Sequence, residues 1–219
     1  CGGVLDKHIS ELIYWQGRFE NEKGNFVNAH YRKLMLDIAQ EHDDSFLKGK
    51  IVADFGCGPR GSLAWTTAPA RRIGIDVLVP FYLDCFGECM LKHEMDYITS
   101  TERLIPLPAA SVDVLFTINS LDHVANLDEM ANEILRILKP GGLFFASFNL
   151  NEPANDAEPQ CLSEEILRKH LFKRIDIKSY RIALKNEKET YKNFQENRIL
   201  TRNRPDKPCI LWASGIKRN

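Results

Sequence analysis

A glycine-rich turn directly after an apolar strand constrains the fold of this chain more than any other feature. Residues 51–55 (IVADF) are mostly apolar, as in a strand buried in a parallel sheet, and residues 56–61 (GCGPRG) follow at once. Gly56 and Gly58 permit a tight turn and a close approach of the backbone to a ligand. The free amides of a following helix favour anionic groups. The pattern predicts a strand–turn–helix unit of a doubly wound α/β fold.

An acidic residue at a set distance from this turn extends the prediction. Asp76 ends the next predicted strand, residues 72–76, and lies 20 residues after Gly56. A carboxylate in this place can accept hydrogen bonds from both hydroxyls of a ribose. The residues therefore predict a nucleoside-containing ligand at the carboxyl edge of the sheet. The alternative is a strand–helix turn that binds nothing.

Strands and helices alternate along most of the remaining chain. Further strands are expected at residues 112–118 and 143–148, and helices at residues 4–18, 26–41, 81–91 and 126–138. Such alternation implies right-handed crossovers and a mostly parallel sheet. The last two strands, residues 175–184 and 209–216, have no predicted crossover helix of their own, so we expect them to pair antiparallel at the sheet edge.

Composition excludes some classes of protein and leaves one alternative open. The apolar fraction is 44% and the charged fraction 27%, as in a globular domain. No apolar run reaches the roughly 20 residues of a membrane helix. The net charge is −1, yet residues 164–219 carry 15 Lys and Arg against 7 Asp and Glu. This split allows a polyanionic partner, but Lys alternates with Glu there as on a solvated surface, which disfavours nucleic acid.

The cysteines predict neither a disulfide framework nor a metal site. The six are Cys1, Cys57, Cys85, Cys89, Cys161 and Cys209. A chain of this length forms a core without disulfides, and no signal peptide is apparent, so we expect free thiols in the cytoplasm. Cys85, Cys89 and His93 share one predicted helical face, where a zinc site is the alternative to apolar packing. A fourth ligand is missing, so no metal is expected. The first residue is Cys1 rather than Met, which is compatible with a trimmed start.

Several segments in a fixed order resemble the class I S-adenosylmethionine-dependent methyltransferases. They are residues 52–59 (VADFGCGP), 73–76 (IGID), 105–108 (IPLP), 111–115 (SVDVL), 119–124 (NSLDHV) and 133–142 (EILRILKPGG). An acid such as Asp54, two residues before the first glycine, is typical of this family, whereas dinucleotide enzymes usually have an apolar residue there. One departure is the third glycine, which the family has at the position of Arg60 and this chain has at Gly61. An NAD(P)-dependent oxidoreductase therefore stays an alternative.

The resemblance implies a Rossmann-like, doubly wound, mostly parallel seven-stranded sheet with an antiparallel C-terminal edge strand. It implies an N-terminal helical lid over residues 1–45 and a methyltransferase domain over residues 46–219. S-adenosyl-L-methionine would be the cofactor and S-adenosyl-L-homocysteine the product. The cofactor-binding residues that it implies are Asp54, Gly56, Cys57, Gly58, Asp76, Val77, Leu78, Asp96 and Asn119. Among these, Asp76 would hold the ribose, Val77 and Leu78 would flank the adenine, and Asp96 would meet its amino group.

The sequence says less about the methyl acceptor. Methyl transfer from a sulfonium depends chiefly on alignment, so a general base is needed only for a protonated, weakly acidic acceptor. His123, just beyond the strand at 112–118, is the candidate base, with plain packing as its alternative. Acidic residues of the loop at 151–161 are a candidate acceptor wall. Residues expected to bind the acceptor, or else to pack as core, are Trp15, Arg18, His30 and Tyr31.

These observations together predict an enzyme that methylates an oxygen or nitrogen atom of a small molecule. Three alternatives stay open: an RNA or other polyanion methyltransferase, a non-catalytic S-adenosylmethionine-binding or scaffold domain, and the oxidoreductase. Either a monomer or a homodimer is compatible with the sequence.

Overall fold

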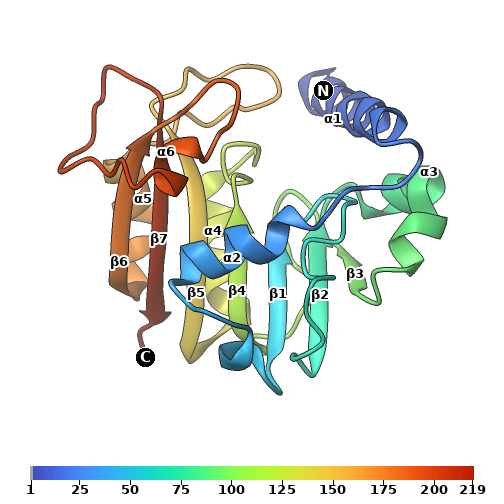
Figure 1. Cartoon of the computed structure of the whole chain (residues 1–219), viewed down its shortest axis with the longest axis horizontal. Helices are drawn as coiled ribbons and strands as arrows, with labels where there is room; N and C mark the ends of the chain where they lie inside the picture. Colours follow the sequence, from blue (N-terminus) through green and yellow to red (C-terminus); the bar gives the residue numbers. More distant parts are fainter. Residues whose placement is uncertain (1) are drawn as a thin grey trace.

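Seven strands form one sheet in the order β3-β2-β1-β4-β5-β7-β6 (Figure 1). The computed structural model describes the backbone of residues 2–219 and the side chains of residues 7–219, so Cys1 lies outside the described residues. The strands are β1 (Ile51–Phe55), β2 (Arg71–Asp76), β3 (Asp96–Thr99), β4 (Val112–Ile118), β5 (Leu138–Leu150), β6 (Ile175–Leu184) and β7 (Cys209–Lys217). The α-helices are α1 (Gly2–Asn21), α2 (His30–Ala39), α3 (Val79–Leu91), α4 (Leu127–Ile137), α5 (Glu164–His170) and α6 (Lys192–Gln195).

The pairing of the strands confirms the predicted fold class. Strands β1 to β5 pair in parallel, and β7 pairs antiparallel with both β5 and β6. The C-terminal strand is antiparallel as predicted, but it lies second from the edge rather than at the edge. Burial explains this order, because β7 is buried at eight of its nine positions whereas β6 is exposed or half-buried at seven of ten. The chain also has a short crossover helix before β6, α5, which the sequence analysis did not predict.

Two layers of helix cover the sheet. On one face α2 packs Met35 and Ile38 against Val52 and Phe116. On the other face α4 and α5 bury their apolar sides in the largest core cluster. Figure 1 shows α2 crossing in front of β4 and β5, with α4 and α5 behind the sheet. Of the residues predicted as an N-terminal lid, those of α2 are therefore part of the main core.

Helix α1 lies apart from these layers. Leu12, Trp15 and Phe19 pack against a cluster that includes Phe26 and Phe86 of the following segments. In Figure 1 this helix lies at the carboxyl ends of β1 and β2, beside α3. None of the helices in the part of the chain that the structure describes has the length and apolar character needed to cross a bilayer.

Candidate functional site

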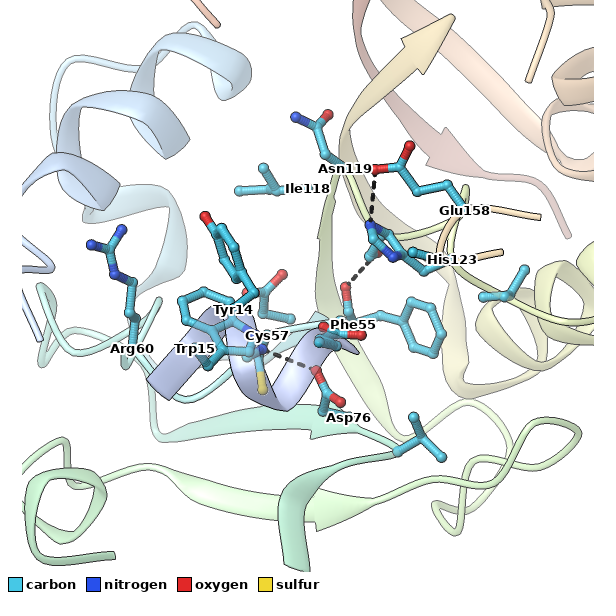
Figure 2. Close-up of a pocket in the computed structure, with 18 of the residues that line it drawn as sticks. Tyr14, Trp15, Phe55, Cys57, Arg60, Asp76, Ile118, Asn119, His123 and Glu158 are labelled. Carbon is cyan, nitrogen blue, oxygen red and sulfur yellow. Dashed lines mark hydrogen bonds and ion pairs between the residues drawn. The ribbon is translucent and has the colours of Figure 1, made fainter. Parts of the chain in front are cut away.

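A pocket of about 670 Å³ opens between the carboxyl ends of the central strands and α1. Phe55 of β1, Asp76 of β2 and Asn119 after β4 form its sheet side. Tyr14 and Trp15 of α1 face them from the opposite wall (Figure 2). The predicted carboxyl edge of the sheet is thus the site of the pocket.

The glycine turn brings the ends of β1 and β4 unusually close together. Gly56 has φ +73°, and a Cβ placed on it would lie 2.1 Å from the Cβ of Ser120. Gly58 has φ +57°, and a Cβ there would lie 2.7 Å from Trp15 Cζ2. Both positions require glycine, because an L side chain would be strained at this φ and would collide with a neighbour. Gly56, Cys57 and Gly58 all line the pocket.

Asp76 ties this turn to the end of β2. Its Oδ2 accepts a hydrogen bond from Gly58 N and its Oδ1 from Leu78 N, each at 3.0 Å. The side chain lines the pocket although the residue is only 7% exposed. Burial, with Glu11 nearby, raises the pKa of this carboxyl group to about 7. Each carboxylate oxygen keeps a lone pair for a ligand in the pocket.

Asp54 is a second buried acid in the wall of the pocket. Its Oδ2 accepts a hydrogen bond from Ser62, whereas its buried Oδ1 has no hydrogen-bond partner in the protein. Burial raises its pKa to about 7 as well. A buried acceptor without a donor is costly, so this oxygen is suited to receive one from a ligand or a water molecule.

Asn119 connects the end of β4 to a segment far along the chain. Its Nδ2 donates to Tyr191 Oη at 2.8 Å, and its Oδ1 accepts from Ser147 Oγ at 2.8 Å. Asn119 has φ +47°, a conformation that Asn tolerates better than most residues. Tyr191 belongs to the charged connection before β7 and lines the pocket. Tyr191 was not among the residues predicted for the site.

The four residues proposed for the acceptor all line the pocket. They are Trp15, Arg18, His30 and Tyr31. Trp15 makes edge contacts with Phe26 and Tyr82, and its buried Nε1 has no hydrogen-bond partner in the protein. Burial lowers the pKa of His30 and raises that of Tyr31. The neutral imidazole and neutral phenol leave Arg18 as the one charged group among these four residues.

Two predicted cofactor residues lie outside the pocket. Asp96 is the first residue of β3, at the amino end of the strand, where its half-exposed carboxylate pairs with Arg71 at 2.6 Å. The sequence analysis expected Asp96 after the third strand, whereas in the structure it begins β3 and lies away from the pocket. Leu78 is fully buried in the cluster between α1 and α3, and of the predicted adenine-flanking pair only Val77 lines the pocket.

The cysteine pattern does not converge on a common point. Cys85 is exposed and Cys89 is buried, with its thiol directed to Asn25 Oδ1 at 3.6 Å. The Nδ1 of His93 lies 2.6 Å from Tyr97 Oη. Each member of the proposed zinc alternative thus has separate contacts.

His123 lines the pocket together with Glu158 of the loop after β5. Its Nε2 lies 3.8 Å from Glu158 Oε1 and 4.0 Å from Asp122 Oδ1. Figure 2 shows the imidazole and the Glu158 carboxylate facing each other beside Asn119. The structure thus brings the candidate base and one acid of the predicted acceptor wall together.

Lys7 of α1 reaches the same end of the pocket and was not predicted. It is 6% exposed, its Nζ lies 3.4 Å from Glu102 Oε1, and it donates a hydrogen bond to His123 O. His8 Nε2 also lies 3.1 Å from Glu102 Oε1. These contacts fasten the first turns of α1 across the pocket. They join residues more than 90 positions apart, and no local pattern in the sequence indicates them.

Comparison with known proteins relates this chain to methyltransferases. A family model described as a methyltransferase domain matches residues 53–146. A ubiquinone biosynthesis O-methyltransferase of Nitrosococcus oceani is 32% identical over 152 residues, which are 67% of this chain and 63% of that protein. A fatty-acid O-methyltransferase of Mycolicibacterium smegmatis is 28% identical over 124 residues, which are 54% of this chain and 43% of that protein.

Solved structures show the same fold. The YcgJ protein of Bacillus subtilis superposes with a TM-score of 0.60 at 16% identity, covering 87% of this chain and 99% of that one. The chain spans about half the length of the first curated relatives that it matches, for example 47% of an uncharacterized methyltransferase of Mycobacterium leprae.

Proposed function

Because this chain belongs to the class I S-adenosylmethionine-dependent methyltransferases, we propose that it transfers a methyl group from S-adenosylmethionine to an oxygen or nitrogen atom of a small molecule. The observation that carries the proposal is the joint position of the glycine turn and Asp76. Asp76 is hydrogen-bonded to the turn and faces the pocket, where a ribose can bind to it.

The residues of the pocket fit this cofactor. Asp76 can accept hydrogen bonds from both ribose hydroxyls, and Val77 lies beside it for the adenine. The unpartnered Oδ1 of Asp54 offers an acceptor for the amino group of the methionine part. Gly56 and Gly58 carry no side chains, so the methionine part of the cofactor has room to lie along the turn. When bound, S-adenosylmethionine supplies a methyl group on a positively charged sulfur.

We assign the lid of this enzyme to α1. Tyr14 and Trp15 wall the pocket on the side opposite the sheet, and Lys7 fastens the helix to the loop at Glu102. A wall of this kind shields the reacting groups from bulk water and holds the acceptor in line with the methyl group, which is most of what this reaction requires. Met35 of α2 is fully buried in the core. We therefore limit the proposed lid to α1 and do not include α2, although the predicted lid segment extended to residue 45.

The acceptor would occupy the part of the pocket between Asn119, Tyr31 and His123. Both named relatives are O-methyltransferases of small molecules or of a small-molecule pathway, which supports a small acceptor. The general-base role of His123 stays a prediction. For the polyanion alternative, Lys185 is paired with Glu152 at 2.7 Å and Lys192 with Glu189 at 3.5 Å, which disfavours an RNA surface there.

Calorimetric titration of the purified chain with S-adenosylhomocysteine and, separately, with NADH tests this proposal. We expect one S-adenosylhomocysteine per chain and no NADH. Transfer of a labelled methyl group from S-adenosylmethionine to small molecules of a cell extract, rather than to its RNA, then establishes turnover and acceptor class. NADH binding without S-adenosylhomocysteine binding would refute the proposal. Binding without any transfer would favour the non-catalytic alternative.

A further inference from the structure

Three potential metal ligands meet at the acceptor end of the pocket. One oxygen each of Asp122 and Glu158 and one nitrogen of His123 all lie within 4.8 Å of one another. Asp122 and His123 follow β4, and Glu158 comes from the loop after β5, so the group joins two neighbouring strand ends. His123 and Glu158 line the pocket, and Asp122 is buried beside them.

Asp122 lacks a partner at the atom that points into this group. The residue is 3% exposed, and its Oδ2 accepts a hydrogen bond from Asn149 Nδ2 at 2.7 Å. Its Oδ1 is buried without a hydrogen-bond partner, and the 4.0 Å to His123 Nε2 exceeds a hydrogen bond. A buried carboxylate needs hydrogen bonds or a counter-charge, and half of this one has neither.

No Lys or Arg neutralises the pair of acids. Within residues 7–219, His123 is the one ion-pair partner found for either Asp122 or Glu158. Lys7, which also lines the pocket, is directed instead to Glu102 and the carbonyl of His123. The two carboxylates therefore face each other across an imidazole with no permanent positive charge between them.

Backbone contacts hold the two loops in this arrangement. Gln160 N donates to Asp122 O at 3.1 Å, and Gln160 Nε2 donates to Val124 O at 2.9 Å. The side chain of Asn155 accepts from the backbone of Glu158 at 2.9 Å, which fixes the turn that carries this acid. The position of Glu158 opposite Asp122 is thus built into the fold.

We propose that Asp122, His123 and Glu158 bind a divalent metal ion at the acceptor end of the pocket, an inference that rests on the proposed function. Two carboxylates and one imidazole form a mixed oxygen and nitrogen set, which suits Mn²⁺, Fe²⁺ or Zn²⁺ better than Ca²⁺. Ligand atoms on such an ion lie roughly 3.0–3.4 Å apart, so small side-chain rotations close the group. Three protein ligands leave coordination positions open toward the pocket.

A metal ion in this place selects an acceptor with a ligating oxygen, such as a hydroxyl group. Bound to the ion, the hydroxyl is more acidic and loses its proton to solvent water. Its oxygen then forms the new bond to the methyl carbon as the sulfur–carbon bond breaks, and the sulfur keeps that electron pair. His123 serves as a ligand in this arrangement, which replaces the general-base role predicted for it from the sequence.

Titration of the full chain with Mn²⁺ after treatment with EDTA tests this inference, with electron paramagnetic resonance to count free Mn²⁺. We expect one ion per chain with a Kd below about 0.1 mM, and nitrogen coupling from the imidazole in the spin-echo spectrum. Glu158→Gln and His123→Gln should each weaken binding at least about tenfold, and the second should abolish the nitrogen coupling. Glu165→Gln is the matched control, since it removes an exposed acid outside the pocket and should leave Mn²⁺ binding unchanged.

Two results would overturn the metal site: binding weaker than about 1 mM, or binding that both ligand variants retain. Circular dichroism shows whether these variants are folded, and Glu158 is one-third exposed, so its variant should fold. Titration with S-adenosylhomocysteine separates the two proposals. If that ligand binds and Mn²⁺ does not, only the metal site fails, whereas failure of both ligands refutes the proposed function itself.

Discussion

Replacement of Asp76 by alanine should sharply weaken the binding of S-adenosylmethionine. In the proposed complex the carboxylate accepts one hydrogen bond from each ribose hydroxyl. Each hydrogen bond to a charged group contributes about 1.5–3 kcal/mol, so the loss of both should cost at least about 3 kcal/mol, or roughly 150-fold in Kd. The pKa of Asp76 is raised to about 7, so the comparison belongs at about pH 8, where the carboxyl group is ionised.

The structure supplies a matched control and a second variant for this experiment. Asp96 is an acid on the neighbouring strand, half-exposed and outside the pocket, so Asp96→Ala should leave the Kd unchanged. Asp76 also holds the amides of Gly58 and Leu78, so Asp76→Ala can lower stability. Asp76→Asn keeps the shape and one acceptor and should show an intermediate loss of affinity.

Isothermal titration calorimetry with S-adenosylhomocysteine measures these affinities, and circular dichroism shows that each variant is folded. A folded Asp76→Ala protein that binds within about twofold of the parent would refute the proposed ribose contact. An Asp96→Ala protein that loses as much affinity as Asp76→Ala would refute it equally.

Three further predictions follow from the same contacts. Gly56→Ala should lower the free energy of unfolding by about 2–4 kcal/mol in urea denaturation. The new Cβ would lie 2.1 Å from the Cβ of Ser120, and a φ of +73° is strained for alanine. An unchanged denaturation midpoint would refute the close contact. Tyr191→Phe should lower the free energy of unfolding by about 1–2 kcal/mol in the same assay, since it leaves the Asn119 amide without its acceptor. Full stability would show that this hydrogen bond is not formed in solution. The Tm of the ligand-free protein should fall as the pH rises from about 5 to about 7. The carboxyl groups of Asp54 and Asp76 are ionised in the unfolded chain over this interval, whereas in the folded chain they hold protons up to a pKa of about 7; a Tm that rises over this interval would contradict the burial of these acids.

Elements with strong local patterns were predictable from the sequence. The strands at residues 51–55 and 112–118 were placed at their observed bounds, because buried strands between turn residues have a clear apolar pattern. The positions of the glycine turn and of Asp76 beside the pocket were likewise predictable, since they depend on short spacing. The four-residue β3 has no such pattern, because it is exposed or half-buried throughout, and this is why Asp96 was misplaced.

Features that depend on long-range packing were not predictable. The place of β7 inside the sheet depends on its pairing with β5 on one side and β6 on the other, which no local pattern expresses. Tyr191 enters the pocket because its segment is fixed by the stacking of Phe194 on Trp212, with ring centroids 3.8 Å apart. The contacts of Lys7 and the approach of Glu158 to Asp122 likewise join distant loops.

A crystal structure of this protein with S-adenosylhomocysteine tests the central claim most directly. We predict the ribose hydroxyls within about 2.6–3.0 Å of the Asp76 carboxylate oxygens and the homocysteine part along Gly56–Gly58, with its amino group toward Asp54. A ligand bound away from Asp76, or a ribose that does not touch this carboxylate, would contradict the account.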